Sequence, residues 1–128
     1  MSIGIKGVGG VFIRAQNPEK LQKWYEENLG LNFEFSGVSV FSRKNSSEAS
    51  LVFALFDRES DYFGSREKEF MINFWVSDLD AAVKKLREKN CNVPDEIQTT
   101  PQGRFSWVTD PEGNKIELWE PAEDHFKK

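Results

Sequence analysis

Two segments of the chain open with a short run in which apolar and polar residues alternate. They span residues 10–25 and 71–86, so the same plan returns at an offset of 61 residues. In each segment the run ends at a short polar side chain, Asn17 or Asp78, and a charged amphipathic stretch follows. Alternation indicates a half-buried strand, and the amphipathic stretch indicates a helix. The chain is therefore predicted to repeat one strand–helix plan twice.

The two helices are expected over residues 18–28 and 79–90. Asn17 and Asp78 can each accept a hydrogen bond from first-turn backbone N–H groups, and Pro18 suits a first helical position. Gly30 is a suitable residue to end the first helix. Both stretches carry apolar stripes at helical spacing, which predict packing against the core. The stripe residues are Leu21, Trp24, Tyr25 and Leu29 in the first helix and Leu79, Ala82, Val83 and Leu86 in the second.

Three further strands are expected after each helix. The predicted strands are residues 32–35, 38–42 and 50–56, then 93–98, 104–109 and 115–120. A polar loop at 43–49 and a Pro- and Gly-containing turn at 110–114 join neighbouring strands. Each half is thus predicted to be a βαβββ module, at about residues 1–57 and 69–121 of a single domain. A charged linker, 58–68, joins the modules, and its aromatic pair Tyr62–Phe63 suggests that it folds back onto the protein.

The faces of the predicted strands differ in character. Side chains alternate along a strand, so one face of the first strand of each module is small or aliphatic and is expected to face the helix. The other face mixes aromatic and polar groups, which predicts the floor of a pocket. The alternative is that this face is buried against a partner chain. Its predicted ligand-binding residues are Phe12, Arg14, Asn73, Trp75 and Trp119, beside Glu117.

Glu117 is the best candidate for chemistry on this face. Burial among aromatic rings would raise its pKa and allow it to act as a proton shuttle, so it is the predicted catalytic residue. The alternative is an ion pair with Arg14 or Lys115. Tyr62 and Trp107 are further predicted pocket walls, although ordinary core or interface packing is the favoured reading of Trp107.

Composition narrows the function. Apolar residues make up 38% of the chain and charged residues 30%, which is normal for a globular domain. The net charge of -4 argues against a nucleic-acid partner. No apolar run reaches the length of a membrane span, and the N-terminus lacks the features of a secretory signal. With one cysteine, Cys91, and one histidine, His125 in a polar tail, we expect a cytoplasmic protein without disulfides.

Three stretches resemble one known family. Asp110-Pro-Glu-Gly-Asn-Lys-Ile-Glu-Leu-Trp-Glu-Pro121 is similar to the C-terminal signature of the glyoxalase / bleomycin resistance protein / dioxygenase family, within the vicinal oxygen chelate superfamily. Residues 17–30 resemble its first helix and residues 76–83 the start of its second. The resemblance implies an α+β fold in which two βαβββ modules form mixed sheets curving around a cleft, with helices on the outer face. It also implies a homodimer.

The resemblance implies a metal site that this chain does not complete. Metal-using members take His or Glu ligands from the first and last strand of each module. Here the corresponding positions fall on Gly10, on Met71 and within residues 50–56, which contain no His, Asp or Glu. Only Glu117 fills a ligand position. About three protein ligands are usual for a catalytic metal, so we expect no metal cofactor.

Three functions stay open at this point. The favoured hypothesis is a metal-independent protein that binds a planar or cationic small molecule between aromatic walls and Glu117. The alternatives are a metal-dependent lyase, isomerase or dioxygenase of the glyoxalase type, and a dimerisation module without catalysis.

Overall fold

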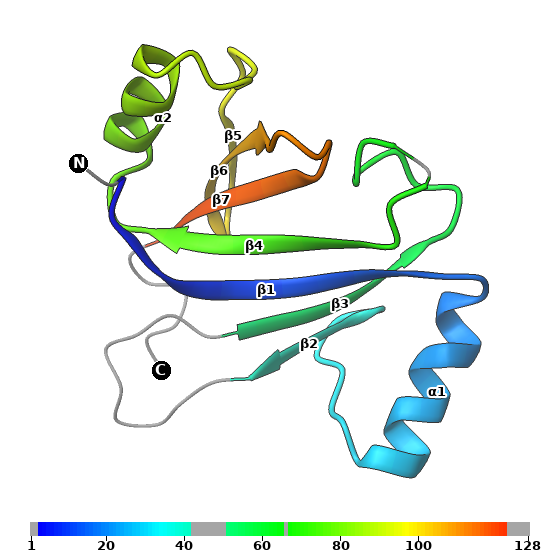
Figure 1. Cartoon of the computed structure of the whole chain (residues 1–128). Coiled ribbons are helices and arrows are strands. Elements are labelled where there is room, and N and C mark those ends of the chain that lie inside the picture. Colours follow the sequence, from blue (N-terminus) through cyan, green and yellow to red (C-terminus); the bar gives the residue numbers. More distant parts are fainter. Residues whose placement is uncertain (1–2, 42–50, 66, 123–128) are drawn as a thin grey trace.

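One curled mixed sheet of seven strands forms the centre of the molecule (Figure 1). The computed structural model describes residues 3–41, 51–65 and 67–122. The strand order is β2-β3-β1-β4-β7-β6-β5. The strands are β1 (Ile5–Ala15), β2 (Val38–Phe41), β3 (Leu51–Asp57), β4 (Phe70–Val76), β5 (Gln98–Thr100), β6 (Gly103–Thr109) and β7 (Lys115–Pro121). The α+β prediction is confirmed, whereas the predicted loop 43–49 and His125 lie outside the described residues.

The two modules meet inside one chain, through the antiparallel pairing of β1 with β4. Within each module the first and last strands are parallel neighbours, β1 with β3 and β4 with β7. The two halves therefore share a single sheet. The chain between β3 and β4 runs from Arg58 to Glu69, and we refer to residues 58–69 as the linker.

The capping residues work as expected. Helix α1 (Pro18–Leu29) begins after Asn17, whose side chain accepts from the Lys20 backbone N–H at 3.1 Å. It ends at Gly30, which has a positive φ of 69° that glycine adopts without strain. Helix α2 (Leu79–Glu88) begins after Asp78, which accepts from the Ala81 N–H at 3.1 Å. Both predicted helices are confirmed.

The helices differ in how they pack, although both carry an apolar stripe. On α2, Leu79, Ala82 and Val83 are buried, and Leu79 and Val83 form a cluster with Val76 and Leu118. By contrast, α1 buries none of its residues, and Trp24 and Leu29 are 51% and 58% exposed. The prediction that the α1 stripe packs into the core holds only in part: Leu21 and Tyr25 are half-buried, and the Tyr25 ring lies 5.2 Å from that of Phe53.

The predicted strand at 32–35 is also wrong. Only Phe35 forms an isolated bridge, with Val38, across the turn at Gly37. Side chains replace the strand partners here: Ser39 Oγ donates to the Asn32 carbonyl at 2.7 Å, and Gln22 Oε1 accepts from the Gly37 N–H at 2.7 Å. These bonds satisfy backbone groups without a neighbouring strand.

The predicted strand at 93–98 is displaced toward the C-terminus, where β5 occupies Gln98–Thr100. Pro94 has no N–H to donate to a sheet. Its carbonyl is taken by Arg87 Nη2 at 2.8 Å. Only Asn92 bridges to the sheet, at Thr109. Apart from this bridge, the segment before β5 does not pair with the sheet.

No helix in the described part of the chain is long and apolar enough to cross a bilayer.

The unequal packing of the helices predicts unequal effects of truncation. Leu79→Ala should lower the free energy of unfolding by about 2–5 kcal/mol, because Leu79 is fully buried. Trp24→Ala should lower it by less than about 1 kcal/mol, although it removes the larger side chain. Urea unfolding followed by far-UV circular dichroism measures both. Equal losses would contradict the exposed position of the α1 stripe.

Candidate functional site

A single row of paired residues crosses six strands on one face of the sheet. Its members are Val40, Val52, Gly10, Asn73, Glu117 and Trp107. In this row Asn73 lies opposite Glu117. Met71, two residues earlier on β4, pairs with Phe12 instead. We assigned the second-module equivalent of the Gly10 position to Met71, and the pairing of Asn73 with both Gly10 and Glu117 corrects that residue to Asn73. Directly paired residues share a face of the sheet, so this row sets the composition of the site.

Glu117 is the buried centre of the row, at 1% exposure. Three donors converge on its carboxylate. Asn73 Nδ2 donates to Oε1 at 2.7 Å, Trp107 Nε1 donates to Oε2 at 3.0 Å, and the Tyr62 hydroxyl also donates to Oε2. Asn73 comes from β4, Trp107 from β6 and Tyr62 from the linker. The linker is thus part of the site, as its aromatic pair suggested.

Burial is the largest cause of the pKa shifts of Glu117, Tyr62 and Lys115. It raises the pKa of Glu117 above the usual range, against the opposing effect of its three hydrogen bonds and of Lys115. Burial and the neighbouring carboxylate raise the pKa of Tyr62, so its hydroxyl keeps its proton and stays a donor. Burial lowers the pKa of Lys115, whose Nζ lies 5.1 Å from the Tyr62 ring centroid and 5.3 Å from that of Trp107.

A cavity of about 380 Å³ opens beside Glu117. Most of its surface is aromatic or aliphatic, with three polar side chains. The lining residues are Gly9, Phe12, Phe35, Val38, Val40, Val52, Ala54, Phe56, Tyr62, Asn73, Gln102, Phe105, Glu117 and Trp119. A volume of this size suits a small organic molecule.

Asn73 has an unmet hydrogen-bonding capacity at this cavity. It is 1% exposed, and its Oδ1 atom has no hydrogen-bond partner. A buried acceptor without a partner is costly. The atom lies over Gly9, where any added side chain would collide with it. The absence of a side chain at Gly9 therefore leaves room for the Asn73 amide.

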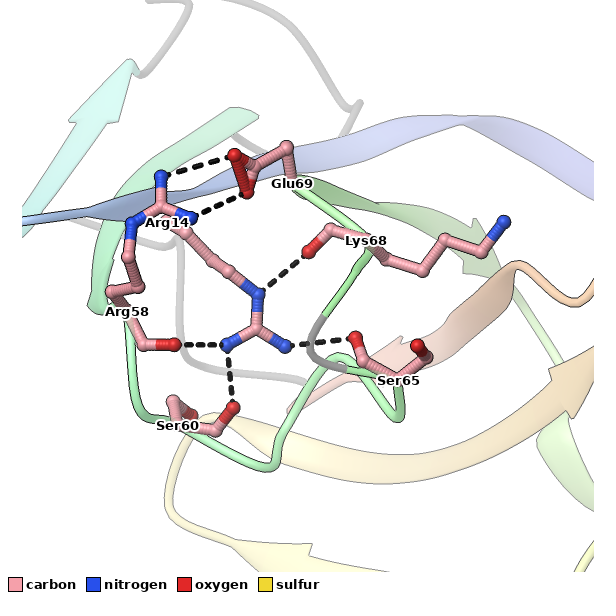
Figure 2. Close-up of polar contacts among 6 residues, drawn as sticks. All are labelled: Arg14, Arg58, Ser60, Ser65, Lys68 and Glu69. Atoms are coloured by element: carbon pink, nitrogen blue, oxygen red, sulfur yellow. Dashed lines mark hydrogen bonds and ion pairs between the residues drawn. The ribbon is translucent and has the colours of Figure 1, made fainter.

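Arg14 lies elsewhere, although we predicted it to bind ligand on the cavity floor. It is not among the cavity-lining residues, and its guanidinium donates to four backbone carbonyls of the linker (Figure 2). The predicted ion pair between Arg14 and Glu117 is likewise replaced by these bonds. Alternation along the strand identified the face but not the long reach of this side chain beyond the cavity.

The predicted tryptophans divide into three positions. Trp119 lines the cavity, stacks on Phe105 with ring centroids 6.0 Å apart, and donates to the Gln102 carbonyl at 3.0 Å. Trp107 lies behind Glu117 in the buried cluster and is a donor rather than a wall. Trp75, half-buried and paired with Trp119 in the sheet, is outside the cavity lining.

Sequence reasoning missed the walls contributed by the edges of the sheet. Val38 and Val40 on β2 and Val52, Ala54 and Phe56 on β3 form one wall, and Gln102 and Phe105 stand opposite. The signal was present in the alternation of β2 and β3, which places these side chains on the same face as Phe12.

The residues around Glu117 do not fit a divalent metal. Within the described ranges, no group of three or more His, Cys, Asp or Glu side chains could hold such an ion. Gly10 and Val52, on the first and last strands of the first module, have no ligating side chain at this row. Asn73, on the first strand of the second module, turns its amide nitrogen toward Glu117. The groups around the carboxylate present N–H and O–H hydrogens to it. A bound metal would instead need neighbouring atoms that offer lone pairs.

A family model matches most of the chain. The sequence model of the Glyoxalase/Bleomycin resistance protein/Dioxygenase superfamily matches residues 7–118. No curated protein matches the sequence.

Solved structures share the fold. Methylmalonyl-CoA epimerase from Mycobacterium tuberculosis is similar at a TM-score of 0.68 and 22% identity, over 97% of this chain and 93% of that one. A Streptomyces coelicolor methylmalonyl-CoA epimerase bound to 2-nitronate-propionyl-CoA gives 0.68 and 16%, over 94% and 97%. A superfamily member from Vibrio splendidus 12B01 gives 0.55 and 10%, over 84% and 93%.

The raised pKa of Glu117 predicts a pH-dependent cost. Between the unfolded and folded pKa values the native state binds more protons, so stability falls as pH rises through that window. Glu117→Gln keeps the shape, and the Asn73 amide can turn so that its unpaired oxygen accepts from the new amide. The variant should lack the decline, which approaches about 1.4 kcal/mol per pH unit inside the window.

Urea unfolding of both proteins across about pH 4 to 8 checks this, because the range begins near the usual glutamate pKa. The exposed turn residue Glu112, replaced by Gln, is the control. Parallel stability profiles for wild type and Glu117→Gln would contradict the expected cost of the buried carboxylate.

Proposed function

The chain belongs to the glyoxalase/bleomycin resistance protein/dioxygenase superfamily, and we propose that within it the protein binds a small, largely apolar molecule without a metal. The cavity beside Glu117 carries this proposal. Its volume of about 380 Å³ and its aromatic and aliphatic walls suit one compact molecule. The buried acceptors at one end would orient that molecule.

The acceptors indicate which chemical group the ligand presents. Glu117 is an acceptor in its charged form, and Asn73 Oδ1 has no partner. A ligand N–H or O–H placed there would supply the missing donor. A site with an unmet acceptor discriminates against molecules that lack the donor. We therefore propose a planar, neutral or cationic ligand with an amine, amide or hydroxyl group at one end.

Metal independence is supported by the direction of the polar groups. Each donor to Glu117 turns a hydrogen toward the carboxylate, and these hydrogens take the positions that an ion would need. We propose Glu117 as a hydrogen-bond acceptor for the ligand rather than a metal ligand.

We also propose that the protein works as a homodimer in the cytoplasm. Exposed apolar side chains on α1 and on the sheet, such as Trp24, Leu29 and Phe70, support an interface between copies. The exposed thiol of Cys91 is compatible with a reducing compartment.

Binding can be tested with N-phenyl-1-naphthylamine, a neutral aromatic amine whose fluorescence rises in apolar surroundings. The wild-type protein should bind it. Val40→Trp, which fills the cavity from the edge strand, should weaken binding at least about tenfold, a loss of about 1.4 kcal/mol. Phe41→Trp adds the same ring at the adjacent, 48% exposed position and should not. Equal binding by both variants would contradict this cavity as the site.

The donor requirement has its own test by competition against the same probe. 1-Naphthylamine should displace it at roughly fivefold lower concentration than N,N-dimethyl-1-naphthylamine, because one net hydrogen bond contributes about 1 kcal/mol. Asn73→Leu, which removes the unpaired acceptor but leaves Glu117, should narrow the difference. Equal competition in the wild type would contradict recognition of a donor.

Metal independence is checked by dialysis against zinc, manganese, nickel and iron(II), followed by elemental analysis. We expect well below one equivalent of each metal per chain, and no change in probe affinity after treatment with a chelator. One equivalent that is lost in Glu117→Gln would overturn the proposal and favour the glyoxalase-type alternative.

A further inference from the structure

One side chain of the sheet binds the linker at four points. Arg14 projects from β1 and is only 6% exposed. Its Nε donates to the Lys68 carbonyl at 2.6 Å, its Nη1 to the carbonyls of Arg58 and Ser60 at 2.8 and 2.6 Å, and its Nη2 to Ser65 at 3.0 Å. Figure 2 shows the guanidinium enclosed by these four carbonyls.

The geometry uses what is particular to arginine. A planar guanidinium presents five N–H donors in a fixed fork, whereas a lysine ammonium is a point charge with three. Here all three nitrogens are engaged, and the guanidinium carbon lies 4.8 Å from the Phe63 ring centroid. The four accepting carbonyls belong to both ends of the linker. Arg14 therefore fixes the shape of the loop as well as its position.

Tyr62 lies inside the segment that Arg14 holds. It is flanked by Ser60 and Ser65, which both accept from the guanidinium, and its backbone N–H donates to Ser60 Oγ at 3.1 Å. Its ring stacks on Phe56, with centroids 5.3 Å apart, and its hydroxyl donates to Glu117. The path from Arg14 to Glu117 therefore runs through the backbone of the linker and the Tyr62 ring.

We infer that Arg14 is a positioning residue: by binding four linker carbonyls it holds the Tyr62 hydroxyl on Glu117 at the wall of the cavity. Without the guanidinium, the linker carbonyls lose their shared donor and Tyr62 moves away from the carboxylate. The effect of Arg14 on ligand binding rests on the proposed function. Its effect on the Tyr62–Glu117 contact is independent of that function and can be tested without a ligand.

The indole N–H of Trp107 reports on this contact, because it donates to the same Glu117 oxygen as Tyr62. Proton–nitrogen NMR spectra resolve the four tryptophan indoles, and Trp107→Phe identifies the signal. Tyr62→Phe removes the hydroxyl and should shift that signal. Arg14→Gln and Arg14→Lys should both shift it in the same direction. In the Tyr62→Phe background, neither should add a further shift.

Two controls separate positioning from other effects. Arg14→Lys keeps the charge, so a shift caused only by charge would be absent from it. Arg58→Gln removes a nearby exposed guanidinium, which pairs with Glu69 at 3.0 Å, but leaves the Arg58 carbonyl that Arg14 uses. It should leave the Trp107 signal in place. Should Arg14→Gln fail to fold, Arg14→Lys carries the same test.

The outcomes are decisive. An unmoved Trp107 signal in folded Arg14 variants, while Tyr62→Phe moves it, overturns the inference. So does a further shift by Arg14→Lys in the Tyr62→Phe background. If the inference holds and the probe binds, Tyr62→Phe and Arg14→Lys should each weaken N-phenyl-1-naphthylamine binding about fivefold, and the double variant no more than either. Failure of probe binding alone bears on the proposed function and leaves the NMR result standing.

Discussion

The burial of one carboxylate beneath three donors is the constraint on which the site depends. A buried charge is costly unless hydrogen bonds compensate for it. Glu117 obtains that compensation from Tyr62, Asn73 and Trp107, which come from three separate segments. The linker, β4 and β6 must therefore be held in register with β7. The hydrogen bonds to this one carboxylate join parts of the chain that lie up to 55 residues apart in the sequence.

The pairing of the modules meets this requirement. Because β1 and β4 pair antiparallel at the centre of the sheet, residues that begin the two halves become neighbours, and one row passes from β2 to β6. Gly10 stands in that row without a side chain, and the Phe12 ring lies over the space.

Much of this was accessible from the sequence. Period-two alternation placed Phe12, Asn73, Glu117 and Trp119 on one face, because alternation depends only on local geometry. The helix caps were likewise local. The exposure of α1 was not, because a stripe of apolar residues does not reveal whether the opposite surface reaches it. The position of Arg14 was also inaccessible, since its four partners are carbonyls, which every residue carries.

The hydrogen bonds around Glu117 do not suit a metal ligand. A metal would require Glu117 to direct lone pairs toward an ion, with other lone pairs around it. Instead the carboxylate receives hydrogens on both oxygens, and the neighbouring Asn73 amide oxygen has no partner among the described residues. Lys115 balances part of the negative charge from behind the aromatic rings. Among the described residues the cavity beside Glu117 therefore offers hydrogen-bonding side chains but no set of ligands for a metal.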